Sequence, residues 1–136
     1  MLCFYILMRV LGVNKWLSLV GSIAYAFSSY NAIIIAVGHN TKMLTIAYLP
    51  AAMAGLYLVF KEKWLTGAAL LGISFALIFT NNHFQVIYYA LIMFACFAVA
   101  MLYIAVKEGR LKQFFISCAI AGGAIAIGVG PSMGSI

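Results

Sequence analysis

The feature that most constrains the fold is a series of long apolar runs that contain almost no charge. Mostly uncharged residues cover 16–37, 43–60, 64–80, 86–106 and 113–130. A helix needs roughly 17 to 25 such residues to cross about 30 Å of hydrocarbon. A sixth run, 2–13, is interrupted by Arg9 and is too short before that charge to span a bilayer unaided. The sequence therefore predicts an all-α, polytopic transmembrane bundle of about six helices, the first one partial, in a single region over residues 1–136.

Composition excludes the main alternatives to a helical membrane protein. The chain is 67% hydrophobic and 7% charged, which leaves too few charged side chains to cover a water-soluble domain. Barrel strands alternate apolar and polar residues over about ten positions, whereas these runs are apolar on all sides and longer. The net charge of +6 does not indicate a nucleic-acid partner, because the basic residues mark the ends of the runs and form no stripe. Membrane lipid is the expected partner.

The distribution of basic residues predicts an orientation. If the runs alternate in direction, the loops at one face contain seven of the eight basic residues, and the loops at the other face contain only Lys42. The positive-inside rule places the seven in the cytoplasm. The seven are Arg9, Lys15, Lys61, Lys63, Lys107, Arg110 and Lys112. Glu62 and Glu108 fall in the same cytoplasmic loops and are expected to pair with neighbouring lysines there.

Two polar interruptions lie on the predicted extracytoplasmic side and contain both histidines. They read GHNTK at 38–42 and NNHFQ at 81–85. In the first, the glycine lets a backbone approach an anion and Lys42 can meet a phosphate as a point charge. The second adds amides and an imidazole. Together they suit an anionic headgroup or another polar ligand at the outer surface of the membrane.

The same loops lack the groups that catalysis and metal binding need. General acid–base chemistry requires a titratable group near the reacting proton, and no Asp or Glu lies on the outer face. Two histidines without a nearby carboxylate or thiolate are too few ligands for zinc. We therefore expect no metal site, no cofactor and no catalytic residue that the sequence alone can name.

Polar and helix-distorting residues within the runs allow alternative local structures. In run 16–37, Asn31 and its polar neighbours fit either helix–helix packing in one continuous helix or a helix that ends near Phe27 beside a polar cavity. Pro50 removes a backbone donor and should kink its helix unless a neighbour takes up the freed carbonyl. Close helix packing is expected at small residues four apart, namely Ala51 and Gly55, Ala68 and Gly72, and Ala119 and Gly123.

Several of these segments resemble the bacterial YfhO-like membrane proteins. The matching stretches are AFSSYN at 26–31, GHNTK at 38–42, IAYLP at 46–50, and NHFQ at 82–85 followed by Tyr88 and Tyr89. The two histidine-containing pieces, in order and about forty residues apart, are the distinctive part of the match.

The resemblance implies a multi-pass protein of the bacterial cytoplasmic membrane with the fold of GT-C-type glycosyltransferases. Such enzymes transfer a sugar from a polyprenyl-phosphate carrier to a cell-envelope acceptor on the extracytoplasmic face. It implies that His39, Asn40 and Lys42 bind the donor phosphate. It also implies that Asn82, His83 and Gln85 bind the sugar or orient a loop. This sequence has no counterpart of the family's first, acidic outer loop, so it is expected to be an internal fragment that is inactive without the missing helices of a longer protein.

Two other classes of function are compatible with the sequence. A membrane transporter could use Asn31 and a kink at Pro50 to line a path, with two histidines to exchange protons. However, no ionisable residue lies deep in any full run. A non-catalytic membrane scaffold, or a truncated remnant, would explain the missing outer carboxylate directly.

Overall fold

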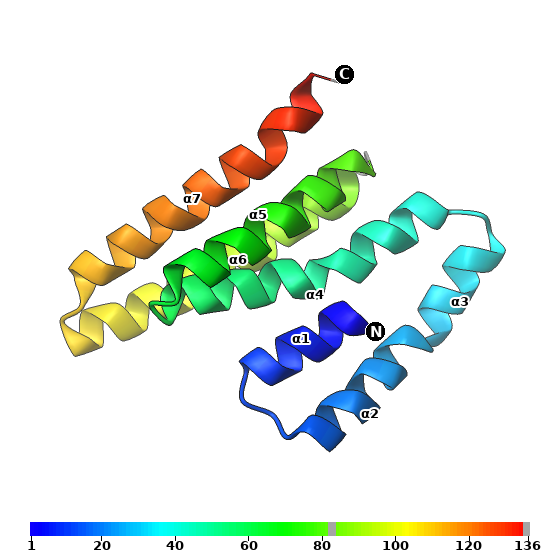
Figure 1. Cartoon of the computed structure of the whole chain (residues 1–136), viewed down its shortest axis with the longest axis horizontal. Coiled ribbons are helices and arrows are strands. Elements are labelled where there is room, and N and C mark those ends of the chain that lie inside the picture. The colour runs from blue at the N-terminus through cyan, green and yellow to red at the C-terminus, as the bar shows by residue number, and fades with distance from the viewer. Residues whose placement is uncertain (82–83, 135–136) are drawn as a thin grey trace.

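The computed structural model describes residues 1–81 and 84–134, and the polypeptide in these ranges is helical with no strand. The sequence therefore predicted the fold class correctly, as an all-α bundle. The helices are α1 (Leu2–Val10), α2 (Lys15–Ala26), α3 (Ser29–Ala36), α4 (Asn40–Phe60), α5 (Trp64–Thr80), α6 (Phe84–Glu108) and α7 (Leu111–Met133). Figure 1 shows α4, α5, α6 and α7 as long rods that alternate in direction.

Within the described ranges, four segments are long and apolar enough to cross a membrane: Lys15–Ala36, Asn40–Phe60, Phe84–Glu108 and Leu111–Pro131. The helix over Trp64–Thr80 is apolar but slightly shorter. These five segments correspond to the five full runs of the sequence, and α1 corresponds to the partial run. Every apolar run of the sequence therefore folds as helix, over one or two segments.

The core lies where α4 and α5 cross and where α7 packs against α5. Its buried side chains include Leu56, Val59, Leu71, Phe75 and Ile78. At the centre of the α4–α5 contact, a Cβ added to Gly55 would lie 2.6 Å from the backbone nitrogen of Leu71. A Cβ added to Gly67 would lie 2.6 Å from the backbone nitrogen of Val59. The backbones of α4 and α5 thus touch, and only glycine fits at these two positions.

The prediction that small-residue pairs mark close helix packing was partly correct. Gly55 lies in the α4–α5 contact, and Gly72 faces the backbone of Ala124 in α7. The prediction for Gly123 was wrong, because a Cβ there would meet nothing within 4 Å. Gly128 makes the close approach instead, against the carbonyl of Gly72. Residues 123 and 128 are five apart, so they lie on different faces of α7.

Run 16–37 is broken into α2 and α3, so the first helix ends near Phe27 as one of the two alternatives had it, but Asn31 lines none of the three cavities found among the described residues. Asn31 is buried, and its side-chain amide donates hydrogen bonds to the carbonyls of Tyr25, at 2.8 Å, and Ala26, at 3.5 Å. These carbonyls lie at the end of α2, beyond the reach of intrahelical donors, and that of Tyr25 also accepts from the N–H of Ser28 at 3.4 Å. Asn31 therefore caps α2 from α3, and its amide hydrogens are engaged with backbone.

Pro50 lies inside α4 without ending the helix, which runs from Asn40 to Phe60. A proline at position 50 cannot donate to the carbonyl of Ile46, four residues earlier. The hydroxyl of Tyr25 in α2 donates to that carbonyl at 3.1 Å. A neighbour therefore takes up the freed acceptor, and the Tyr25 ring is itself stacked on Phe4 of α1, with ring centroids 4.6 Å apart.

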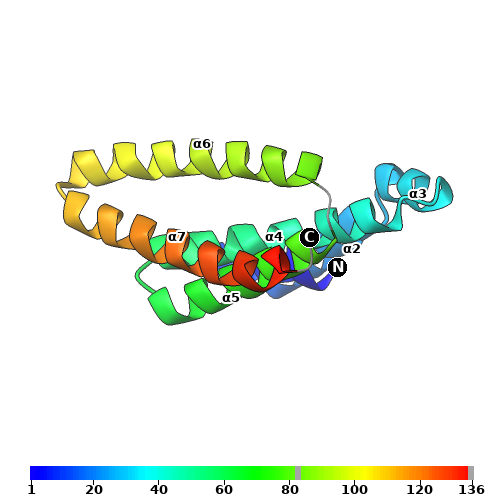
Figure 2. The same cartoon turned by 90° about the horizontal axis from the view of Figure 1, so that it is seen from above.

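Helix α6 is an outer member of the bundle. In Figure 2 it runs along one side of the molecule, over α4 and α7. It packs through buried aliphatic side chains, among them Ile87 and Ala90, and through two ring contacts. Phe94 lies 5.6 Å from Phe75, and Phe97 lies 5.8 Å from Phe60, measured between ring centroids. Most of its apolar residues, such as Val99 and Tyr103, are exposed on the surface of the isolated chain.

Candidate functional site

The first predicted site segment is the connection between α3 and α4. Gly38 has a positive φ of +83°, a conformation that favours glycine. Its N–H donates to the carbonyl of Ile35 at 3.0 Å, and the N–H of His39 donates to Ile34 at 3.1 Å. These two bonds form the Schellman arrangement that closes a helix end. The glycine therefore has a structural role here, which is to end α3 and turn the chain into α4.

The N-terminus of α4 has free donors. His39 is the N-cap residue, and no side chain caps the helix. The backbone N–H of Met43 makes the first bond within the helix, to the carbonyl of His39 at 3.2 Å. The backbone amides of Asn40, Thr41 and Lys42 form the first turn and therefore point out of the helix end. Such amides, at the positive end of the helix dipole, favour a bound anion.

The side chains at this helix end are accessible. His39 and Asn40 are exposed, and Lys42 is half-buried in the first turn of α4. A lysine at this position adds positive charge to an end that the helix dipole already makes positive. The three residues that the resemblance assigns to the donor phosphate therefore lie within one turn of chain at one helix terminus.

The second segment is placed only in part. Asn81 ends α5, and its side-chain amide donates to the carbonyl of Leu77 at 2.9 Å. Asn82 and His83 lie outside the described residues. Gln85 is exposed in the first turn of α6. Of the three residues assigned to the sugar, the structure therefore locates Gln85 alone.

The start of α4, the end of α5 and the start of α6 lie toward the same end of the bundle (Figure 1). Among residues 1–81 and 84–134, no hydrogen bond joins the side chains of His39, Asn40 or Lys42 to Gln85. The three principal cavities are lined by other residues. A single surface built from both loops stays a prediction.

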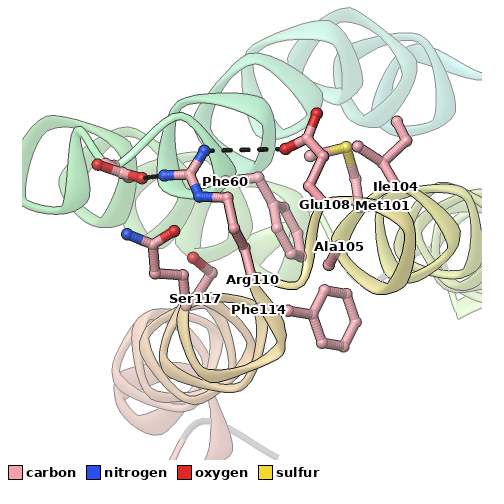
Figure 3. A pocket seen from close by; sticks show the side chains of 10 residues that line it. Phe60, Met101, Ile104, Ala105, Glu108, Arg110, Phe114 and Ser117 are labelled. Atoms are coloured by element: carbon pink, nitrogen blue, oxygen red, sulfur yellow. Dashed lines mark hydrogen bonds and ion pairs between the residues drawn. The ribbon is translucent and has the colours of Figure 1, made fainter.

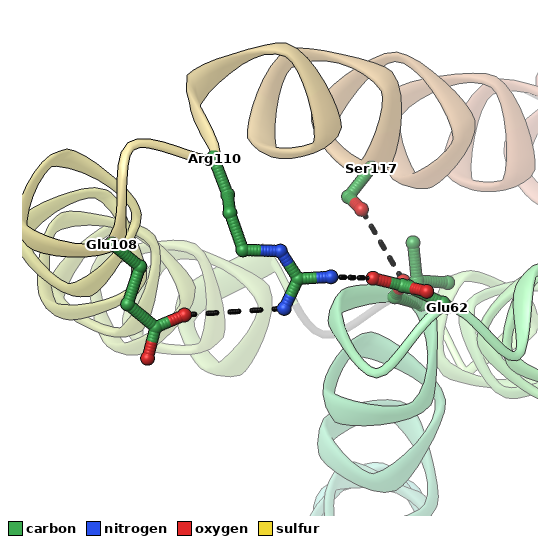
Figure 4. A network of polar contacts seen from close by, with 5 residues as sticks. Glu62, Glu108, Arg110 and Ser117 are labelled. Atoms are coloured by element: carbon green, nitrogen blue, oxygen red, sulfur yellow. Dashed lines mark hydrogen bonds and ion pairs between the residues drawn. The ribbon is translucent and has the colours of Figure 1, made fainter.

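A polar cluster that the sequence did not predict lies at the opposite end of the bundle. Arg110, in the α6–α7 turn, forms an ion pair with Glu62 of the α4–α5 turn and a longer one, at 3.9 Å, with Glu108 (Figure 4). The expectation that the two glutamates pair with lysines was wrong among the described residues. Lys61 instead lies over the ring of Tyr57, 5.6 Å from its centroid. Glu62 and Arg110 are 48 positions apart, so no local pattern could have indicated the pair.

The same cluster borders a small cavity, drawn in Figure 3. Its volume of about 60 Å³ suits water rather than a lipid or a sugar. Ser117 lines it, is buried, and donates to the carbonyl of Val59 at 3.3 Å, which joins α7 to α4. Glu62, Glu108 and Arg110 are each about half exposed, so their ion pairs contribute little stability. This end of the bundle is a junction between two hairpins.

Comparison with known proteins gives no family for this chain. No protein-family model matches it, and neither the curated proteins nor the solved structures contain a significant match.

Proposed function

We propose that this chain is part of a bacterial inner-membrane protein that binds a polyprenyl-phosphate-linked sugar on its extracytoplasmic face. The proposal rests on the N-terminus of α4, where uncapped backbone amides, His39, Asn40 and Lys42 are gathered. In this proposal the bundle is a fragment of a GT-C-like fold, and the lipid-linked sugar is the donor for transfer to a cell-envelope acceptor.

The charge distribution supports the orientation. The turns α1–α2, α4–α5 and α6–α7 lie at one end of the helices. Seven basic residues lie in or beside these turns: Arg9, Lys15, Lys61, Lys63, Lys107, Arg110 and Lys112. Among the described residues, the other end carries Lys42 as its only basic side chain. Basic residues concentrate on the cytoplasmic side of membrane proteins, so the start of α4 would face outward.

The chemistry of this helix end suits a phosphate that becomes a leaving group. Backbone amides at a helix N-terminus bind anions, and a lysine ammonium adds a full positive charge. As the sugar is transferred, negative charge grows on the departing lipid phosphate, and fixed donors would stabilise that charge. Asn82, His83 and Gln85 would bind the sugar or orient a neighbouring loop.

The proposed role is donor binding rather than catalysis. The sequence contains only two acidic residues, Glu62 and Glu108, and both lie beside Arg110 at the opposite end of the bundle. No carboxylate of this chain is therefore placed to deprotonate an acceptor near His39. A complete transferase would need an acidic residue from polypeptide beyond this sequence.

The test is binding of a photoreactive polyprenyl phosphate to the whole chain in lipid nanodiscs. Lys42→Ala removes one charge-assisted contact, which is worth about 1.5–3 kcal/mol, so binding should weaken by roughly ten- to a hundred-fold. Lys61→Ala removes the same charge from the opposite end and should leave binding unchanged. If the two variants bound the polyprenyl phosphate with equal affinity, the N-terminus of α4 would not be part of the binding site.

A further inference from the structure

A second basic site lies at the opposite end of the bundle, in a groove between α1 and the end of α4. It has a volume of about 340 Å³ and is lined by Tyr5, Ile6, Arg9, Val10, Leu58 and Lys63. That volume is within the range of sites that bind small molecules or headgroups. The two cations come from segments 54 residues apart in the sequence, so the fold, and not local sequence, brings them to one groove.

The groove contains two positive charges and no carboxylate. One guanidinium nitrogen of Arg9, Nη1, donates to the carbonyl of Val13 at 2.8 Å, which holds this long side chain at the end of α1. Its remaining N–H groups have no hydrogen-bond acceptor among the described residues. Lys63 is the N-cap residue of α5, and the structure gives it no ion pair within residues 1–81 and 84–134.

Several other charged side chains at this end have a partner, and Lys107 and Lys112, which have no ion pair among the described residues, do not line the groove. Glu62, the chain neighbour of Lys63, is paired with Arg110 on the side of α7. Lys15 lies 5.5 Å from the ring centroid of Trp16, and Lys61 lies over Tyr57. What distinguishes Arg9 and Lys63 is that both line the same groove, and neither has an anionic partner among the described residues.

The rest of the lining is apolar. Ile6, Val10 and Leu58 are half-buried and form its hydrocarbon wall, and Tyr5 adds a phenol that can donate a hydrogen bond. A ligand that fits needs a negative group for the cations and an apolar part for the wall. Basic pockets between helices near the membrane surface bind anionic lipid headgroups for the same reason.

We infer that the α1–α4 groove binds one anionic glycerophospholipid, with its phosphate between Arg9 and Lys63 and an acyl chain along Ile6, Val10 and Leu58. A free phosphate ion would satisfy the two cations but would leave the apolar wall unused. The lipid is therefore the occupant that the whole lining fits. This inference concerns the end of the bundle remote from His39 and is independent of the proposed donor site.

The experiment uses Trp64, the residue that follows Lys63, as a fluorescent reporter. Trp16 is the other tryptophan of the chain, so a Trp16→Phe variant leaves one emitter. This variant is reconstituted in phosphatidylcholine vesicles, and its quenching by brominated phosphatidylglycerol is compared with its quenching by brominated phosphatidylcholine. We expect the anionic lipid to associate about tenfold more strongly beside Trp64.

In that background, Arg9→Gln and Lys63→Gln should each reduce the preference for the anionic lipid about fivefold, since each removes one basic contact at the membrane surface. Lys61→Gln is the matched control, because it removes a charge two positions from Lys63 but outside the groove, and it should leave the preference intact. Arg9→Lys and Lys63→Arg should retain it, which separates loss of charge from misfolding.

Three outcomes would overturn the inference. Equal quenching by the two brominated lipids would show that no anionic lipid is selected. An equal loss for Lys61→Gln and Lys63→Gln would show diffuse attraction to the whole basic end. Displacement of the lipid preference by millimolar inorganic phosphate, at constant ionic strength, would show a site for the free ion.

Discussion

The hydroxyl of Tyr25 donates a 3.1 Å hydrogen bond to the carbonyl of Ile46, the acceptor that Pro50 leaves without its partner in α4. Within hydrocarbon, an unpaired backbone carbonyl has no water to satisfy it. The proline is therefore tolerated inside a membrane-length helix because a side chain from α2 supplies the missing donor.

Tyr25→Phe should lower the free energy of unfolding by about 1–3 kcal/mol, because it leaves the Ile46 carbonyl without a donor. In a Pro50→Ala background, the new N–H at position 50 can donate to Ile46, so the same substitution should cost less than about 1 kcal/mol. Unfolding in mixed micelles measures all four proteins of this double-mutant cycle. Tyr30→Phe, at an exposed tyrosine, is the control. Equal costs in both backgrounds would mean that the hydroxyl does not replace the proline's missing donor.

Gly55→Ala should destabilise the bundle by about 1–3 kcal/mol, because its Cβ would lie 2.6 Å from the backbone nitrogen of Leu71 and force α4 and α5 apart. Gly123→Ala is a matched control in a helix where the Cβ meets nothing within 4 Å. It should be neutral or stabilise by up to about 1 kcal/mol through helix propensity. Thermal unfolding in detergent tests this, and the opposite ranking would rule out the α4–α5 backbone contact.

Ser117→Ala and Arg110→Gln should differ in their response to salt. The hydrogen bond from Ser117 to Val59 is buried, so its loss should cost about 1 kcal/mol at any ionic strength. Arg110 pairs with exposed carboxylates, so its loss should cost between about 0 and 1 kcal/mol. That cost should disappear near 1 M salt, where the Debye length is about 3 Å. A salt-sensitive Ser117→Ala or a salt-insensitive Arg110→Gln would contradict this assignment.

The two ends of α4 should lie on opposite sides of the membrane. In a variant without Cys3, Cys96 and Cys118, we expect a membrane-impermeant maleimide to label His39→Cys in intact cells and Lys61→Cys only after permeabilisation. This follows from the excess of basic residues at the Lys61 end. The reverse labelling pattern would mean that the bundle has the opposite orientation and that the proposed donor site faces the cytoplasm.

The sequence predicted the helices well, because membrane-length apolar runs leave the backbone few other ways to satisfy its hydrogen bonds. It predicted details less well where side-chain hydrogen bonds or the rotation of a helix decide the packing. The sequence left two structures open for run 16–37, and the one found has the amide of Asn31 donating to the carbonyl of Tyr25 at the end of α2. The choice of Gly128 over Gly123 depends on which face of α7 meets α5.

The candidate site was predictable to a smaller extent. The spacing of the motif placed His39, Asn40 and Lys42 together at one helix start, since they are neighbours in the chain. The sequence could not indicate that Gly38 serves to end α3, because that role depends on two backbone bonds across the turn. Nor could it bring Arg9 and Lys63 to one groove, because they meet only when α1 packs against α4.

The glycine contact between α4 and α5 has a mechanical consequence. Two helices whose backbones touch at Gly55 and Gly67 cannot slide past one another without a collision, so this pair forms the rigid axis of the molecule. Helix α6 contains no glycine and packs through side chains such as Ile87, Phe94 and Phe97, so it has no such backbone contact among the described residues. If the bundle changes conformation when it binds a ligand, we expect α6 to move relative to α4 and α5, and we expect α4 and α5 to keep their relative position.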